Sequence, residues 1–145
     1  MEYGIVIRVV EVDEYGMITV VIDVASRGFN GSSQVYTTTS ALETLSAGLQ
    51  FFPEDASQSV EFELGTPQSY GYLSIAFSVL DARGRCQCNV RLESNYVLMH
   101  GPGSKNRIDV DMGVEPNAID RFVSDLKNLH NNKARQAVLE GIENF

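Results

Sequence analysis

Residues 70–92 read YGYLSIAFSVLDARGRCQCNVRL, and they contain two apolar runs on either side of a turn. In the second run every other position is apolar, from Cys86 to Leu92. A period of two is typical of a half-buried β-strand, and the glycine at position 84 suits a tight connection between two strands. The stretch therefore predicts an antiparallel β-hairpin.

Strand-like runs also occur on both sides of this hairpin. Residues 4–13 and 16–25 are two β-rich runs with a short, glycine-containing connection, and a third strand is predicted near residues 31–37. Alternation at residues 60–64 and 108–114 adds one strand before the hairpin and one after it. Because the connections are short, antiparallel pairing is favoured. The sequence thus predicts about seven strands.

Two further stretches follow a helical period. Residues 42–52 carry an apolar stripe, and Ser40 with Glu43 is spaced as a capping box at its start. The second stripe runs over residues 119–129 and follows Pro116, a residue that suits a first helical turn. Both stretches are predicted to be amphipathic helices that bury one side.

The predicted fold is a single α+β domain over residues 1–145. It is mainly an antiparallel twisted sheet in the order β-β-β-α-β-β-β-β-α, with both helices packed on one face. Residues 132–145 are expected to form either a short helix or a loosely ordered tail. The strands near residues 5–12 and 70–80 are apolar on both sides, which indicates a central or curved part of the sheet or an interaction surface, such as a homodimer interface.

Charge is distributed unevenly along the chain, whose net charge is −8. Residues 1–72 contain ten acidic and two basic side chains, whereas residues 73–145 contain nine of each. An acidic half repels phosphate, so direct nucleic-acid binding is not expected. A basic protein is the expected binding partner, because its charge is opposite to that of this half. No signal peptide or long apolar run is present, so the expected location is the cytoplasm and no membrane association is expected.

No arrangement of residues typical of catalysis is found. Cys86 and Cys88 are two positions apart on a predicted strand, so both are expected to point to one face as free, packed thiols. A zinc site would need further ligands, and only His100 and His130 remain among the histidines. We therefore expect no metal site, no cofactor and no enzymatic activity.

Acidic and aromatic side chains on the predicted outer faces are the candidate binding residues. Paired acids on a half-buried strand are usually solvated side chains, but a cluster of them can also bind a basic partner. The alternative is a small-molecule pocket beside the aromatic pair on the open sheet face. The candidate partner-binding residues are Glu61, Glu63, Tyr70, Tyr72, Asp109 and Asp111.

The order of these segments also resembles a known family. Residues 28–36, GFNGSSQVY, with the capped helix that follows, are similar to a segment of small bacterial immunity proteins of the wall-associated toxin type and of related uncharacterised bacterial proteins. The alternating run that ends at Leu92, the strand at 108–114 and the helix at 119–129 extend the resemblance over residues 28–130. The resemblance implies a non-enzymatic cytoplasmic protein that binds and neutralises a cognate toxin, often a nuclease.

Overall fold

The computed structural model describes residues 3–96, 103–130 and 134–142. Within these ranges the chain forms eight strands and two helices. They are β1 (Gly4–Val12), β2 (Met17–Ser26), β3 (Phe29–Thr38), α1 (Thr39–Leu49), β4 (Ser59–Gly65), β5 (Gly71–Val79), β6 (Cys86–Tyr96), β7 (Ser104–Val114), α2 (Pro116–His130) and β8 (Gln136–Glu140). The α+β class, the dominance of antiparallel strands and both predicted helices are confirmed.

The strands form two sheets rather than the one sheet that the sequence predicts. One sheet has the order β3-β2-β1-β8 and the other β4-β5-β6-β7, and every neighbouring pair is antiparallel. Helix α1 connects β3 of the first sheet to β4 of the second, and the chain returns to the first sheet with β8 after α2. The two strands with apolar residues on both sides, β1 and β5, each lie between two others. A central position accounts for the buried part of each strand, whereas Val10 and Val12 lie beyond the pairing of β1 with β8 and are about half exposed.

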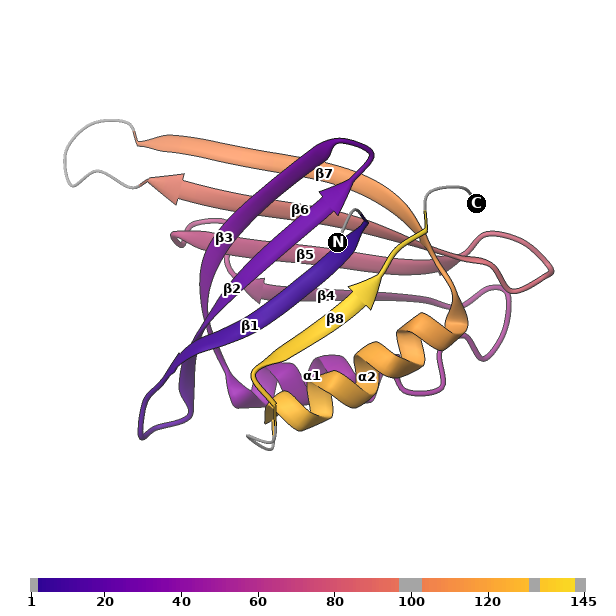
Figure 1. The fold of residues 1–145 in the computed structure, drawn as a ribbon, viewed down its shortest axis with the longest axis horizontal. Coiled ribbons are helices and arrows are strands. Elements are labelled where there is room, and N and C mark those ends of the chain that lie inside the picture. Colours follow the sequence, from indigo (N-terminus) through magenta and orange to yellow (C-terminus); the bar gives the residue numbers. More distant parts are fainter. Residues whose placement is uncertain (1–2, 97–102, 131–133, 143–145) are drawn as a thin grey trace.

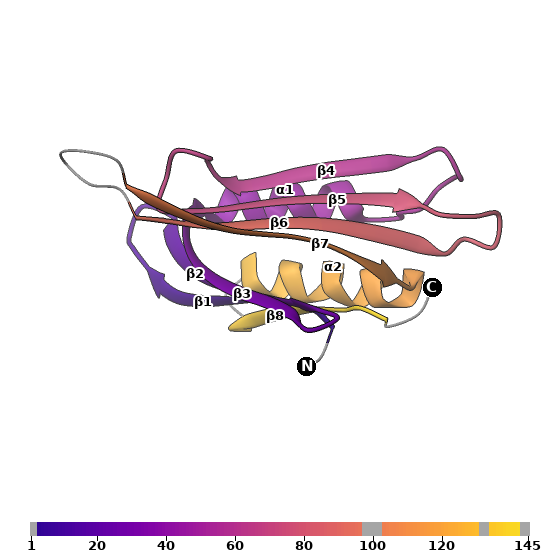
Figure 2. The same cartoon turned by 90° about the horizontal axis from the view of Figure 1, so that it is seen from above.

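The two sheets lie as layers that are close on one side and apart on the other (Figures 1 and 2). On the close side β3 packs against all four strands of the other sheet. Gly71 of β5 lies against the backbone carbonyl of Gln34, where a Cβ atom would overlap that group. The hydroxyl of Ser33 donates to the carbonyl of Glu93 at 2.7 Å and links the two sheets at the same place.

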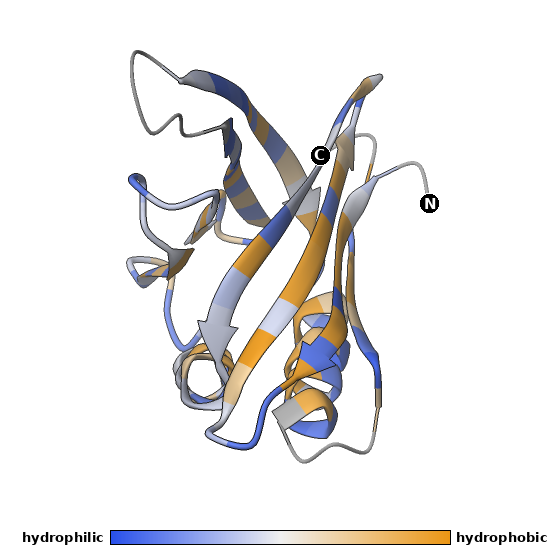
Figure 3. Ribbon diagram, turned by 90° about the vertical axis from the view of Figure 1, so that its left-hand side faces the viewer, coloured by the Kyte–Doolittle hydropathy of each residue, from blue (hydrophilic) through white to orange (hydrophobic). Residues whose placement is uncertain are grey.

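The two helices lie between the sheets, where the sheets diverge (Figure 2). α1 packs against α2, and α2 packs in turn against β8. This differs from the predicted arrangement, in which both helices cover one face of a single sheet. The apolar residues of both sheets and both helices form one continuous core, and orange and blue segments alternate along the strands that enclose it (Figure 3).

The start of α1 differs from the predicted capping box. Thr38 is the N-cap, and its Oγ1 accepts a hydrogen bond from the Ala41 N–H at 3.1 Å. Ser40 already lies inside the first turn and is exposed. The helix ends at Leu49, before the last residues of the predicted stripe over 42–52.

The C-terminal segment is a strand, so the expectation of a short helix or a loosely ordered tail for residues 132–145 is wrong where the structure describes them. β8 pairs with β1, with Ala137 opposite Ile7 and Leu139 opposite Ile5. Ala137 and Leu139 are fully buried, so a period of two, not the helical period, places the apolar side chains. The pairing partner, β1, is far away in sequence, which is why local spacing did not reveal this strand.

Candidate protein-binding face

The outer face of the β4–β7 sheet collects the predicted acidic residues. Residues that lie opposite each other in paired strands share a face of the sheet. Two adjacent cross-strand rows run from β4 to β7: the first contains Glu61, Ala76, Asn89 and Asp111, and the second contains Glu63, Ser74, Arg91 and Asp109. We call these eight residues the acidic face. Four of the six predicted binding residues are thus brought together, although β4 and β7 are far apart in sequence.

The two aspartates of β7 are held by side chains of β6. The Asn89 amide donates to Asp109 at 2.9 Å and to Asp111 at 2.8 Å, so one side chain bridges both carboxylates. Arg91 lies 3.5 Å from the second oxygen of Asp109, with both side chains about half exposed. An ion pair at such exposure contributes little to stability. These contacts orient the carboxylates and leave them accessible.

Tyr72 was predicted to contact a partner directly, but it is only 5% exposed. Its hydroxyl donates a 2.9 Å hydrogen bond to Oε1 of Glu63, and that bond fixes the position of the carboxylate. Burial raises the pKa of Tyr72 above its usual value, and the hydrogen bond to Glu63 raises it further. The strand period placed Tyr72 on the outer face but could not show that its neighbours cover it. Tyr72 therefore positions an acid of the acidic face rather than forming part of its surface.

Tyr70 is separated from the acidic face, since it lies in the connection before β5. It is 56% exposed, and its carbonyl accepts a hydrogen bond from the Asn95 N–H at 2.7 Å. Neither Tyr70 nor Tyr72 lines either of two cavities, of about 460 and 430 Å³, that the described residues form. The predicted pocket beside these two tyrosines is therefore not among them.

One of these cavities lies between α1 and β4, at the border of the acidic face. Its volume is about 430 Å³. Ala41, Leu45 and Phe62 provide apolar walls, while Glu61 and Glu63 line it with carboxylates. Sequence analysis identified the two acids but not the cavity, because the contact between α1 and β4 has no local signature.

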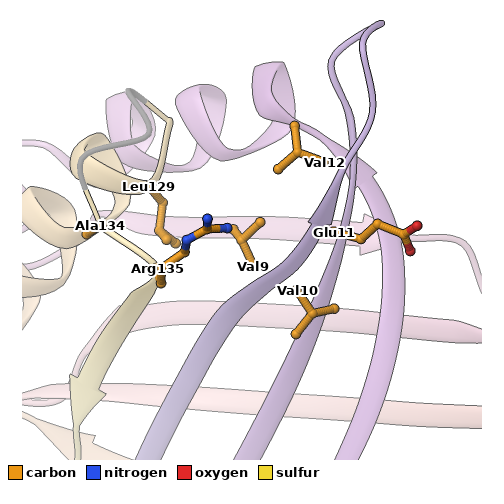
Figure 4. A pocket seen from close by; sticks show the side chains of 7 residues that line it. All are labelled: Val9, Val10, Glu11, Val12, Leu129, Ala134 and Arg135. Carbon is orange, nitrogen blue, oxygen red and sulfur yellow. The ribbon is translucent and has the colours of Figure 1, made fainter.

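A second cavity of about 460 Å³ lies at the far end of β1 (Figure 4). β8 begins opposite Arg8, so the cavity opens where the pairing of β1 with β8 ends. The side chain of Arg135 reaches toward Val9, while Glu11 points away from it (Figure 4). Valines of β1 and Leu129 make up most of the remaining lining. This cavity has a mixed lining and no grouped acids.

A buried polar cluster lies on the same sheet face, beyond the two acidic rows. Glu93 is buried, and its Oε1 lies 3.3 Å from the half-exposed ammonium group of Lys105. The Asn95 amide donates to the carbonyl of Ser69 at 2.8 Å, and Lys105 lies 3.4 Å from the carbonyl of Pro67. These contacts hold the β4–β5 connection against the sheet. The cluster thus has a structural role.

The cysteines are packed as predicted and offer no reactive thiol. Cys86 and Cys88 are free and fully buried. Burial raises the pKa of both thiols, and Asp111 adds to the effect at Cys88. In the described ranges, no three His, Cys, Asp or Glu side chains are grouped so that they could hold a metal ion. His100 lies outside these ranges.

The chain matches no protein-family model, no curated protein and no solved structure. Neither helix in the described part of the chain combines the length and the apolar character needed to cross a membrane. The class of protein is therefore defined by its own architecture: an α+β protein with two four-stranded antiparallel sheets around two helices.

Proposed function

We propose that this chain is a non-enzymatic binding protein, an immunity-type inhibitor that acts in the cytoplasm and whose acidic face covers the basic site of a nuclease-like toxin. The observation that carries the proposal is the charge of the acidic face. Its eight positions include four carboxylates and one guanidinium group. A nuclease must attract phosphate, so its active site is commonly basic, and an acidic surface of opposite charge is steered toward it.

The dimensions of the face suit a protein partner. Three strand spacings separate Glu61 from Asp111, or about 14 Å at the usual distance between paired strands. Within each row the side chains contributed by β5, Ala76 and Ser74, are small, so Glu61 and Glu63 of β4 stand above them, while Asn89 and Arg91 of β6 lie between β5 and the two aspartates of β7. A folded domain can therefore approach both pairs of acids at once. No known match supports this function, and the resemblance of residues 28–130 to immunity proteins is an independent reason for proposing it.

The test begins with the products of the genes next to this one. A basic, nuclease-like domain among them is purified in an inactivated form, and its affinity for the chain is measured by calorimetry at low and moderate salt. We expect tight binding that weakens as salt increases. The variant Glu61→Lys/Asp111→Lys should bind at least about tenfold more weakly, because each reversal places like charges in contact.

A matched control carries the same change in net charge on the other sheet. Asp23 and Glu140 are exposed acids, each in a surface ion pair, and belong to the β3-β2-β1-β8 sheet. Asp23→Lys/Glu140→Lys should bind almost as well as the unmodified chain. The proposal is wrong if no basic neighbouring product binds, or if both double variants lose affinity equally.

A further inference from the structure

We infer that the cavity between α1 and β4 receives an arginine side chain of the partner. This inference rests on the proposed function, since it names the group by which a basic partner would be recognised. It is carried by three features of the described residues: an apolar wall, two carboxylates without a cationic partner, and a hydrogen bond that fixes one of the two.

The apolar part of the cavity fits the methylene stem of a long basic side chain. Leu45 is buried at the base, and Ala41 lies one helical turn before it on α1. Phe62 forms the wall on β4, and its ring lies directly against Gly48, where a Cβ atom would collide with it. Long basic side chains bury their stems along such surfaces while the charged head stays in a polar environment. A volume of about 430 Å³ is large enough for one such side chain.

Five acids in the described part of the chain are engaged in ion pairs, and the two carboxylates at the cavity are not among them. Asp23, Asp81, Glu93, Asp109 and Glu140 each have a Lys or Arg partner within ion-pair distance. Among the described residues no such partner accompanies Glu61 or Glu63. Their charges are therefore available to a cation from outside the chain.

The spacing of the two acids favours arginine over a smaller cation. Glu61 and Glu63 are two positions apart on β4, or about 6–7 Å along the strand. A guanidinium group has five N–H donors in a planar fork, so one group can reach two carboxylates. Oε1 of Glu63 is already engaged by the Tyr72 hydroxyl, which fixes the carboxylate. A pre-positioned acceptor lowers the entropic cost of binding.

The direct test uses a peptide probe and does not need the partner. The peptide acetyl-Gly-Arg-Gly-amide is titrated into the isotopically labelled chain, and NMR shifts are followed at low salt. The control is the same peptide with citrulline, which has nearly the same shape as arginine and no charge. We expect saturable shifts centred on Ala41, Leu45 and Phe62, with a Kd on the order of 1–10 mM. The citrulline peptide should bind at least about tenfold more weakly.

Variants separate the cavity from the general charge of the protein. Glu61→Gln should weaken arginine binding at least about threefold, whereas Glu11→Gln, which removes the same charge at the other cavity, should leave it unchanged. Thr44→Met places a larger side chain into the lining and should abolish binding, while the spectrum of the core stays that of the folded chain. The inference is overturned if the two peptides bind equally, or if the shifts lie away from α1 and β4.

The outcomes also separate this inference from the proposed function. If the arginine peptide binds in the cavity and no basic neighbouring product binds the chain, the cavity inference stands and the proposed function fails. If a toxin binds and Thr44→Met leaves its affinity unchanged, the proposed function stands and the cavity inference fails.

Discussion

Replacing Lys105 by methionine should destabilise the protein by about 2 kcal/mol. The ammonium group lies 3.3 Å from Oε1 of Glu93, whose side chain is 4% exposed, while that of Lys105 is 52% exposed. Removing one partner of a fully buried pair costs about 3–5 kcal/mol, and an exposed pair contributes about 0.2–1 kcal/mol. Because the carboxylate is buried and the ammonium is half exposed, the cost should fall between these limits.

The Lys105–Glu93 pair also holds the β4–β5 connection in place, which adds to its contribution to stability. Lys105 lies 3.4 Å from the carbonyl of Pro67, and Oε1 of Glu93 has no hydrogen-bond partner among the described residues. Without the ammonium group the carboxylate loses its nearest cation. Methionine retains most of the apolar stem, so the substitution tests the charge more than the packing.

Urea unfolding followed by circular dichroism measures the change, and a thermal scan should show a midpoint lower by roughly 4–8 °C. Glu93→Gln should cost less than Lys105→Met, because it leaves a half-hydrated cation rather than a buried anion. The double variant should recover to within about 1 kcal/mol of the unmodified chain. A loss below about 0.5 kcal/mol for Lys105→Met, or no recovery in the double variant, would refute the reasoning.

Three further outcomes can be checked on the purified chain. Thr38→Ala should cost about 1 kcal/mol in urea unfolding because it removes the N-cap of α1, whereas Ser40→Ala should be nearly neutral; equal losses would mean that Ser40 also caps the helix. Gly71→Ala should cost more than about 3 kcal/mol or prevent folding, because the new Cβ atom meets a backbone carbonyl of β3; near-native stability would contradict the close packing of the two sheets. Cys86 and Cys88 should react with a thiol reagent only after denaturation, because burial raises the pKa of both; rapid labelling of the folded protein would contradict their burial.

Strands β1 to β7 and both helices could be predicted because each has a local period. The alternation from Cys86 to Leu92 and the helical stripe after Pro116 each lie within a dozen or so residues, and the structure has β6 and α2 there. The division into two sheets could not be predicted, because it depends on which distant strands pair. β8 shows this most clearly, because Ala137 and Leu139 are recognisable as the buried side of a strand only once β8 is paired with β1.

The candidate site was predictable in part for the same reason. Alternation on β4 and β7 showed that Glu61, Glu63, Asp109 and Asp111 point away from the core, and the register then places them on one face. Alternation gives the side of a strand but not the depth of a side chain, so Tyr72 was expected on the surface. The cavity beside α1 arises from a contact between elements and has no signature in the sequence.

The acids of this sheet face differ in what their charge does for the fold. Glu93 is compensated by Lys105, so its charge is part of the folded structure. Glu61 has no cationic partner among the described residues and lies two positions from Glu63 on the same side of β4, where like charges repel each other. Glu61→Gln should therefore leave urea stability unchanged or raise it slightly, and still weaken arginine binding. A clear loss of stability would show that Glu61 serves the fold. If a substitution weakens arginine binding but leaves stability unchanged, the replaced side chain acts on a ligand rather than on the fold. The two measurements on Glu61→Gln therefore separate an acid that serves binding from one that serves the fold.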